Sequence, residues 1–515
     1  MASKITAFRL QNFMGYVDTD WIEFRPITLL FGRNSSGKSA LIRAILLLRQ
    51  SLQAESKPNS TEPIINVGKQ REPLNFIADK GVDLGSFWQM INNHAPFENL
   101  PDQKDAQRQM VFSFRCQITL DALKEIDAEL PFGRITSVDL SLNFQLSEQG
   151  ISELSAITME LSPDNEGKAL DRRVILQAEL FNLNDWQGWY FSNHFQQHNE
   201  LYYTTDTKFL KDNPDDTRIT WRPRFRILTS TGFLPAISVE AKNVEGETKA
   251  TESIAIIFNQ CCEAIKSWLS AETLWRLGPI RSAPRRTYRP AELSQHEWDA
   301  SGEAVVFEYI RSFDEKSEQQ QRINESIEKL TIGKKLRVFP LTYQRLPYSE
   351  ATPDAFQIMV FKDDDSRGVN LMDVGYGASQ IVPIVLKVWS APEKTFGIIE
   401  QPELHLHPKA QAELADLFIK AVNITRDNQS PPTHLYLIET HSEHLILRLL
   451  RRICETTEKK IESESLSITS ANVQVLYIRT EDHGSKIYQL AITPDGDFEE
   501  KWPDGFFDER IAELC

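Results

Sequence analysis

Cysteine, excess positive charge and long apolar runs are all scarce in this chain of 515 residues. Its five cysteines are scattered and odd in number, which argues against a disulfide framework or a zinc ribbon and predicts a reducing, cytoplasmic setting. No stretch of about 18 apolar residues occurs, and the first residues show no signal-peptide pattern, so no membrane partner is expected. The net charge of −16 argues against broad, non-specific binding of nucleic acid but leaves room for a local basic stripe and for DNA as a partner.

What the chain does have is the composition of a folded globular protein, 41 % hydrophobic and 25 % charged. Its most informative segment runs from Gly32 to Ser39 and fits G-x-x-x-x-G-K-[ST], the phosphate-binding loop. The glycines permit a tight turn, and successive backbone N–H groups form a cradle for anions at the start of a helix. Lys38 is expected to reach the β- and γ-phosphates of ATP, and the Ser39 hydroxyl is expected to bind Mg²⁺. The residues predicted to hold the nucleotide on this loop are Gly32, Asn34, Ser35, Ser36, Gly37, Lys38 and Ser39.

The surroundings of this loop fit the motif. Residues 27–31 are an apolar run typical of a buried strand, and residues 40–53 have the spacing of an amphipathic helix. A strand, the loop and a helix in this order are the setting that a phosphate-binding loop requires. The chain is therefore predicted to bind a nucleoside triphosphate.

Strand and helix patterns alternate in the last third of the chain, as they do in a parallel α/β sheet. They cover residues 356–361, 381–388, 396–399, 410–422, 435–438 and 444–453. A long stretch separates them from the phosphate-binding loop, so one nucleotide-binding core is predicted to be split by an insertion. The predicted fold class is α/β: a split P-loop ATPase head with a mixed β-sheet flanked by helices, plus a large inserted α+β region.

The intervening stretch has less regular patterns. Residues 110–114 and 138–144 alternate apolar and polar side chains, which predicts strands. Residues 181–250 are aromatic and polar with little periodicity, and we interpret them as an irregular part of the insertion. Residues 254–269 and 303–330 have helical spacing.

A second group of motifs follows the insertion. Residues 396–399 form an apolar strand that ends in Glu400, and a carboxylate at the carboxyl end of a parallel strand lies at the ligand edge of the sheet. Glu400 is therefore a candidate Mg²⁺ ligand, directly or through water, as in a Walker B strand. Upstream, Asp373–Gln380 is a glycine-rich segment that leads into a helix. Downstream, the strand at 435–438 runs into Glu-Thr-His-Ser, which contains His441.

Together these segments resemble the ABC-type ATPases, the superfamily that includes SMC proteins and the OLD ATPases. Residues 399–408, IEQPELHLHP, are similar to their Walker B strand and D-loop. The resemblance implies that Gly375, Gly377 and Ser379 belong to a signature loop that contacts the γ-phosphate held by an opposite subunit. It also implies that His441 is the switch histidine, that ATP and Mg²⁺ are the cofactors, and that the chain forms a homodimer or higher homo-oligomer.

Two positions depart from the family pattern. Glu400 stands where aspartate is more usual, and Gln401 stands where the second acid, the general base, is expected. A neutral amide orients water but cannot accept its proton, so slow hydrolysis is predicted. Glu403 lies two residues further on and is a weaker candidate for that role. The residues expected to carry the chemistry are Gln401, His441 and Glu400.

Two further stretches resemble a prokaryotic subfamily of OLD-like ATPases with a C-terminal domain of unknown function. Leu277–Tyr288 is similar to its Leu-Gly-Pro-(apolar)-Arg segment, and Trp502–Arg510 is similar to the end of its small closing domain. Relatives of this kind are ATPase subunits of antiphage defence systems, among them Septu-type ATPases paired with a separate nuclease. The resemblance therefore implies a separate effector, a nuclease, since we find no acidic pattern of the OLD Toprim nuclease domain after His441.

Several interpretations stay open. The arginines at 281–289 either contact phosphates of a nucleic acid or nucleotide, or form an ion-paired loop in an acidic protein. The histidine pairs 441/444 and 405/407 are compatible with a metal, although no cysteine cluster or H-E-x-x-H motif accompanies them. The first interpretation of the whole chain is an ATP-switched dimeric head that controls an effector. The alternatives are an SMC-like DNA-repair or chromosome-maintenance clamp and a small-molecule kinase.

The length of the chain gives room for roughly two to four domains. The predicted parts are an N-terminal ATPase lobe with the phosphate-binding loop at 1–85, an inserted α+β region at 86–250, a helical region with the arginine-rich loop at 251–345, a C-terminal ATPase lobe at 346–455 and a small C-terminal domain at 456–515.

Overall fold

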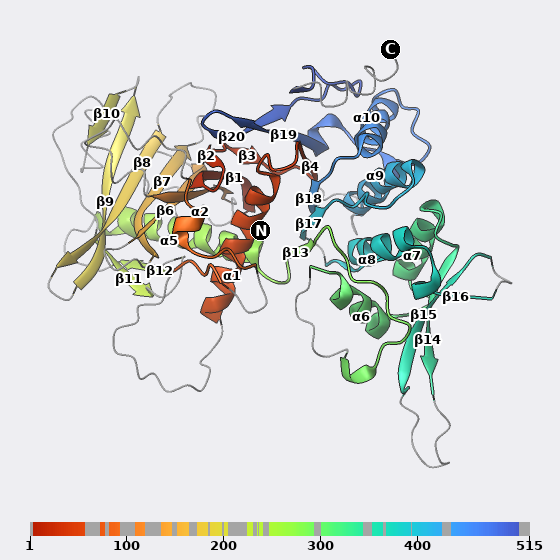
Figure 1. The fold of residues 1–515 in the computed structure, drawn as a ribbon. Coiled ribbons are helices and arrows are strands. Elements are labelled where there is room, and N and C mark those ends of the chain that lie inside the picture. Colours follow the sequence, from red (N-terminus) through yellow and green to blue (C-terminus); the bar gives the residue numbers. More distant parts are fainter. Residues whose placement is uncertain are drawn as a thin grey trace. The chain divides into compact units, whose positions relative to one another are not determined.

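The fold is that of a computed structural model, drawn as a ribbon in Figure 1. The structure describes residues 4–56, 73–77, 82–92, 109–118, 135–146, 152–163, 173–183, 186–197, 200–203, 224–229, 234, 236–239, 247–292, 300–342, 353–363, 367–392, 394–424 and 434–503. The chain divides into two compact units. Unit 1 comprises Met1–Glu23, Ser39–Ser270 and Thr480–Lys486, and unit 2 comprises Phe24–Lys38, Ala271–Arg479 and Ile487–Cys515.

Unit 1 is built on an antiparallel sheet. The order of its strands is β12-β11-β9-β8-β7-β6-β5-β1-β2, with β10 added to β9 and β3 added to β1. The strands are β1 (Lys4–Phe13), β2 (Tyr16–Asp18), β3 (Ile22–Glu23), β5 (Met110–Gln117), β6 (Ile135–Leu146), β7 (Ser152–Pro163), β8 (Arg173–Leu183), β9 (Trp186–Gln197), β10 (Glu200–Tyr203), β11 (Arg224–Thr229) and β12 (Ala236–Val239). Its helices are α1 (Lys38–Ser56), α2 (Phe87–Met90) and α5 (Glu247–Leu269).

Several expectations for this part of the chain are confirmed. The alternating runs at 110–114 and 138–144 lie in β5 and β6, and the helical spacing at 254–269 lies in α5. The irregular interpretation of 181–250 is wrong for the described residues, which include β9, β10, β11 and β12. Aromatic side chains favour strands even where apolar and polar residues do not alternate cleanly, and antiparallel pairing with neighbours supplies the order.

Unit 2 contains the sheet that carries the candidate site. Its order is β13-β17-β18-β4-β19-β20, and the neighbours from β13 to β19 run parallel. The strands are β4 (Ile27–Gly32), β13 (Leu274–Leu277), β17 (Phe396–Glu400), β18 (Leu435–Glu439), β19 (Val473–Glu481) and β20 (Gly484–Leu490). Every residue of β4 and β17 is buried, as expected for central strands of a parallel sheet. Because β4 lies between β18 and β19, the predicted split core is confirmed.

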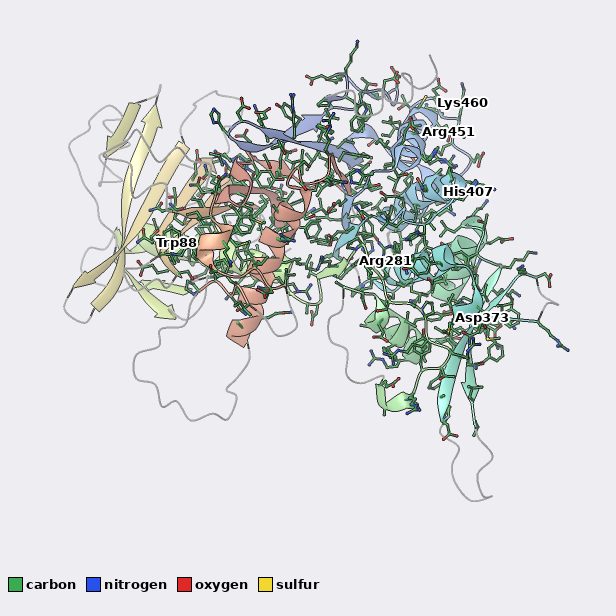
Figure 2. The ribbon with its side chains drawn as sticks, in the orientation of Figure 1. Trp88, Arg281, Asp373, His407, Arg451 and Lys460 are labelled. Atoms are coloured by element: carbon green, nitrogen blue, oxygen red, sulfur yellow. The ribbon has the colours of Figure 1, made fainter. Side chains whose placement is uncertain are left out.

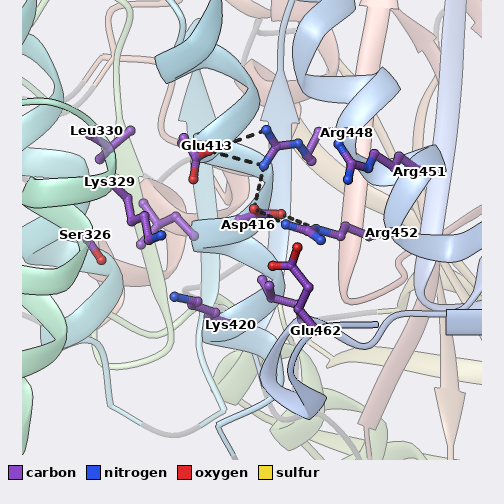
Figure 3. A pocket seen from close by; sticks show the side chains of 12 residues that line it. Ser326, Lys329, Leu330, Glu413, Asp416, Lys420, Arg448, Arg451, Arg452 and Glu462 are labelled. Carbon is purple, nitrogen blue, oxygen red and sulfur yellow. Dashed lines mark hydrogen bonds and ion pairs between the residues drawn. The ribbon is translucent and has the colours of Figure 1, made fainter. Parts of the chain in front are cut away.

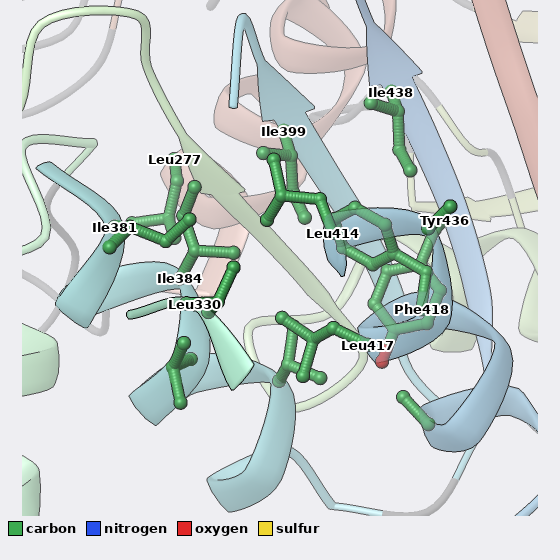
Figure 4. Packing of buried hydrophobic residues seen from close by; sticks show 14 of the residues in the cluster. Leu277, Leu330, Ile381, Ile384, Ile399, Leu414, Leu417, Phe418, Tyr436 and Ile438 are labelled. Atoms are coloured by element: carbon green, nitrogen blue, oxygen red, sulfur yellow. The ribbon is translucent and has the colours of Figure 1, made fainter. Parts of the chain in front are cut away.

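Helices cover this sheet, and their apolar side chains form a core with those of the strands. They are α6 (Glu303–Ser312), α7 (Glu318–Lys329), α8 (Tyr376–Ser390), α9 (Pro408–Val422) and α10 (Glu443–Thr457). Apolar side chains from α8 and α9, among them Ile384 and Phe418, pack with Ile399 of β17 in one buried cluster (Figure 4). The helical pattern predicted at 303–330 is two helices, because Phe313 adopts an extended conformation and the Ser317 side chain caps the second helix.

A small antiparallel sheet precedes α8 in unit 2. It consists of β14 (Lys335–Leu341), β15 (Ala355–Phe361) and β16 (Val369–Asn370). Among the described residues, no helix has both the length and the apolar character needed to cross a membrane.

Candidate functional site

The candidate site lies in unit 2, at the carboxyl edge of the parallel sheet. β17 and β18 end in register, with Glu400 opposite Glu439, and Glu439 is in turn opposite Leu30 of β4. The chain segments that leave these three strands therefore start at the same edge. Ligands of open α/β sheets bind at this edge.

The loop after β4 has the backbone that its glycine pattern predicts. Gly32 has a φ of 146°, and a Cβ at this position would collide with the carbonyl of Ile478. Asn34 and Ser35 are exposed, whereas Ser36 is buried and its Oγ has no hydrogen-bond partner among the described residues. A buried hydroxyl without a partner, on a loop too crowded for a side chain at Gly32, fits a loop that closes around a phosphate group.

Lys38 begins α1 and is only 4 % exposed. Its Nζ donates to the carbonyl oxygens of Gly32 at 2.8 Å and Arg33 at 2.9 Å, so the ammonium here binds its own loop. Burial lowers the pKa of Lys38, and the charge of Glu439 opposes that shift. The β- and γ-phosphates of a nucleotide would offer this ammonium charged acceptors in place of the two carbonyls.

Two buried carboxylates end the strands next to this loop. Glu400 Oε1 accepts a hydrogen bond from Arg276 Nε at 2.6 Å. Glu439 Oε2 has no hydrogen-bond partner in the described part of the chain, and burial, followed by the charge of Glu400, raises the pKa of Glu439 to about 6. Nucleotide-bound Mg²⁺ takes one or two carboxylates together with phosphate oxygens and water. Glu400 and Glu439 fit a Mg²⁺ of that kind.

Metal binding by protein ligands alone finds no support in the described ranges, where no group of three or more His, Cys, Asp and Glu side chains is placed to hold a metal ion. The His405 ring packs against the Tyr376 ring with centroids 4.9 Å apart. His407 caps α9, since its Nδ1 accepts from the Lys409 N–H at 3.3 Å. Ser39, the other predicted Mg²⁺ ligand, is an exposed residue of α1, and its pairing with Glu400 stays a prediction.

Gln401 follows β17 in a left-handed conformation, with a φ of 45°. Its N–H donates to the carbonyl of Glu439 at 2.7 Å, which joins this turn to the end of β18. Its side chain is half-buried. The position predicted for the general base therefore lies at the sheet edge, beside Glu400, and it carries an amide.

His441 lies two residues beyond β18, and its N–H donates to Glu403 Oε1 at 2.7 Å. Burial, and then the charge of Lys38, lowers the pKa of His441, so the imidazole is neutral at pH 7. Burial also raises the pKa of Glu403, although the His441 N–H opposes that shift. Glu403 therefore holds the backbone of the histidine turn, a task that its sequence spacing does not reveal.

The predicted signature segment forms the start of α8. Gly375 and Tyr376 are exposed, and a Cβ on Gly375 would meet nothing within 4 Å. Gly377 is crowded, because a Cβ there would lie 2.5 Å from the carbonyl oxygen of His405. Ser379 is 4 % exposed, and its Oγ donates to the carbonyl of Tyr376 at 2.6 Å. The exposed residues of this segment are therefore Asp373, which pairs with Arg286, and Gly375 and Tyr376; a nucleotide contact by Ser379 stays a prediction.

The arginine-rich segment after β13 is largely ion-paired. Arg285 pairs with Glu303, and Arg286 pairs with Asp373 at 2.7 Å. Both arginines are exposed, so these pairs contribute little to stability. Arg281, labelled in Figure 2, differs from them: it is 2 % exposed, and its Nη2 donates to the carbonyl of Glu400 at the end of β17.

A cavity of about 260 Å³ is lined by residues of α7, α9 and α10, away from the phosphate-binding loop. Its lining is charged, as Figure 3 shows. Arg448 and Arg452 of α10 both bind Asp416 of α9, at 2.6 and 2.8 Å. Ion pairing between α9 and α10 accounts for part of this charged lining.

Sequence reasoning did not assign Glu439, Arg276 or the buried position of Arg281. A signal for Glu439 was present, because two strands end alike in Phe-Gly-Ile-Ile-Glu and Leu-Tyr-Leu-Ile-Glu. Arg276 had no local signal, since its partner Glu400 is 124 residues away.

Three family models match parts of the chain. The model described as "AAA domain" matches residues 8–186, which include the phosphate-binding loop. The model described as "AAA ATPase domain" matches residues 236–446, which include the signature segment, Glu400 and His441. A "Protein of unknown function (DUF3696)" model matches residues 468–514. Of the resemblance at 502–510, residues 504–510 lie outside the described residues, and Trp502 packs edge-on against Phe31 with ring centroids 5.2 Å apart.

The structure is similar to several solved heads of SMC proteins. A crystal structure of the "SmcHead bound to the C-winged helix domain of ScpA" has 10 % identity, covers 95 % of this chain and 98 % of that chain, and gives a TM-score of 0.37. The SMC head domain from Thermotoga maritima has 9 % identity, 95 % and 100 % coverage, and a TM-score of 0.34. An Smc head from Pyrococcus furiosus bound to the C-terminal domain of ScpA has 11 % identity, 99 % and 98 % coverage, and a TM-score of 0.34. No curated protein matches the chain.

The parallel sheet, the phosphate-binding loop and the two matched AAA models are features that this chain shares with nucleotide-binding P-loop ATPases. Within that class, the matched models are of AAA-type ATPase domains.

Proposed function

We propose that this chain is an ABC-type ATPase that binds ATP with Mg²⁺, hydrolyses it slowly and dimerises head to tail around it. In this proposal the dimer regulates a separate effector, a nuclease, in prokaryotic antiphage defence. One observation carries the nucleotide site: Lys38, Glu400 and His441 belong to segments that leave the same edge of one parallel sheet. These segments are far apart in the chain, so their convergence is a property of the fold.

Each of these residues has a task when ATP is bound. The Lys38 ammonium would bind the β- and γ-phosphates, and the carboxylate of Glu400 and the Ser39 hydroxyl would hold Mg²⁺, which would supply positive charge against the phosphates. The imidazole of His441 would form a hydrogen bond at the γ-phosphate.

Slow turnover follows from Gln401. Its amide holds a water molecule beside the γ-phosphate but cannot take its proton, so the ATP-bound state is long-lived. A long-lived bound state suits a switch, because ATP stabilises the closed dimer only by its differential affinity for that form.

The dimer is supported by the exposed start of α8. Gly375 and Tyr376 are exposed, although they belong to a segment that resembles the signature loop. In the proposed dimer they meet the nucleotide held by the other subunit, and each site is complete only with its partner.

Light scattering of the purified chain with and without ATP tests this proposal. The wild type is expected to double in mass on adding ATP and Mg²⁺. Gly375→Arg has open space for its side chain, so it should fold normally and remain monomeric with ATP. Leu447→Arg introduces the same side chain at an exposed position on α10, and this control should dimerise like the wild type. Unchanged association of the Gly375 variant would contradict the head-to-tail arrangement.

The clamp alternative uses the same head, so association alone does not separate the two. It requires duplex DNA to bind more tightly when ATP is present. Fluorescence anisotropy of a labelled duplex, with and without ATP, distinguishes them: ATP-strengthened binding favours the SMC-like clamp, and its absence favours control of a protein effector.

A further inference from the structure

Arg281 is a buried cation in the segment that follows β13. It is 2 % exposed, and burying an unpaired guanidinium is costly. Burial lowers the pKa of Arg281 to about 10, and the charges of Glu403 and Glu400 oppose that shift. An arginine side chain stays protonated in proteins, so the surrounding structure must accommodate its charge.

The guanidinium contacts the backbone of the turn after β17. Nη2 donates to the carbonyl of Glu400 at 2.7 Å and makes a longer contact with the carbonyl of Gln401 at 3.5 Å. Gln401 is left-handed, a conformation that costs a non-glycine residue free energy unless its neighbours hold it. Arg281 supplies part of that hold, directly beside the predicted Mg²⁺ ligand.

The backbone of Arg281 is fixed to α8 by a reciprocal pair of hydrogen bonds. Its N–H donates to Gln380 Oε1 at 3.2 Å, and Gln380 Nε2 donates to its carbonyl at 3.2 Å. Gln380 is itself 2 % exposed and directly follows Ser379 of the predicted signature segment. Arg281 thus binds both α8, whose start is the predicted signature segment and which we call the signature helix, and the turn after β17, which we call the Walker B turn.

We propose that Arg281 is a positioning residue that couples the signature helix to the Walker B turn within one subunit. This inference rests on the proposed function, in which α8 meets the nucleotide of the other subunit. A small displacement of α8 would then move the carbonyls of Glu400 and Gln401 through Gln380 and Arg281. Nε and Nη1 of Arg281 have no hydrogen-bond partner among the described residues, so the cation retains donors for a second acceptor when the turn moves.

Two variants test the coupling at different points. Gln380→Met keeps the length of the side chain but removes both bonds to the Arg281 backbone, and Arg281→Lys keeps the charge but loses the planar fork. Both are expected to lower single-turnover hydrolysis about tenfold or more, because a misplaced catalytic turn is costly. The dissociation constant of a fluorescent ATP analogue should change less than about threefold, since the phosphate-binding loop is untouched.

The matched controls are Gln321→Met on α7 and Arg289→Lys in the same arginine-rich segment, both at exposed positions. They should retain wild-type turnover. Wild-type turnover in both Gln380→Met and Arg281→Lys would overturn the inference. A parallel loss of ATP affinity, turnover and melting temperature would also overturn it, because it would show a merely structural role. A wild type that binds no ATP would instead contradict the proposed function, and this inference with it.

Discussion

Gln401 is the residue on which the rate of the proposed reaction depends most. It lies directly after Glu400, and its N–H is bound by the carbonyl of Glu439. The backbone at this position is therefore fixed, and the chemistry of the side chain decides whether a proton acceptor is present. An amide has none.

Changing Gln401→Glu is expected to accelerate ATP hydrolysis. A positioned general base contributes about 100-fold or more in many enzymes, and a gain of at least about tenfold is expected here. Steady-state phosphate release measures the effect. Gln401→Leu, which has neither proton acceptor nor hydrogen-bonding group, should be no faster than the wild type. An equal or lower rate for the glutamate variant would show that the amide is not limiting.

Single residues also show where sequence reasoning succeeds and where it stops. Lys38 and Glu400 were predictable because each belongs to a local pattern, a loop motif or a strand end. The environment of Arg281 was not, since its partners Gln380 and Glu400 are 99 and 119 residues away. The Leu-Gly-Pro-Ile-Arg segment was noticed in the sequence, but nothing local showed that its arginine is buried.

Among the elements, α9 and α10 are joined by charge as well as by apolar packing. Asp416 of α9 accepts from Arg452 Nε at 2.9 Å and Nη2 at 2.8 Å, and from Arg448 Nη1 at 2.6 Å. Both Asp416 and Arg452 have less than a tenth of their side chains exposed. Loss of a carboxylate partner lowers the stability of a buried cation. Arg452 has a second carboxylate partner in Glu455, which would remain without Asp416.

Asp416→Asn should destabilise unit 2 by about 2 kcal/mol, because it removes the charged acceptor of three hydrogen bonds, while Arg448 keeps Glu413 and Arg452 keeps Glu455. Urea denaturation followed by circular dichroism measures the change in the free energy of unfolding. Glu458→Gln, at an exposed ion pair with Lys460, should unfold at the same urea concentration as the wild type. A comparable effect in the two variants would mean that the pair with Asp416 contributes no more than a surface contact.

The start of α8 supports a second prediction at this scale. A Cβ on Gly377 would lie 2.5 Å from the carbonyl oxygen of His405, whereas a Cβ on Gly375 meets nothing within 4 Å. Gly377→Ala should therefore lower the free energy of unfolding by about 1–3 kcal/mol, as other overpacked sites do. Gly375→Ala should leave it unchanged. Equal melting temperatures for the two alanine variants would contradict the close approach of Gly377 to the His405 carbonyl.

The parallel strands and their helices were the most predictable elements. Apolar runs at 396–399 and 435–438 lie within β17 and β18 because strands buried on both faces need continuous apolar side chains. The break at residues 313–317 had a signal that the helical prediction for 303–330 did not use, since residues 314–322 are all polar. The strands β9 to β12 were missed for another reason: their order comes from antiparallel neighbours and leaves a weak mark on periodicity.

At the scale of the whole molecule, the split core is the feature that the sequence predicted and the sheet confirms. β4 pairs in parallel with β18 on one side and β19 on the other. The strand that leads to the phosphate-binding loop is thus held by strands from the far end of the chain. That each nucleotide site combines residues of two subunits stays a prediction. It rests on the exposure of Gly375 and Tyr376.

A mixing experiment tests the central claim that each nucleotide site combines one subunit's Lys38 with the other subunit's signature segment. Lys38→Met and Gly375→Arg should each be inactive in ATP hydrolysis on their own. Mixed in equal amounts, they should regain activity, up to about half of the wild-type value, because each mixed dimer has one intact site of two. A mixture that remains inactive, or a variant that is fully active alone, would contradict the account.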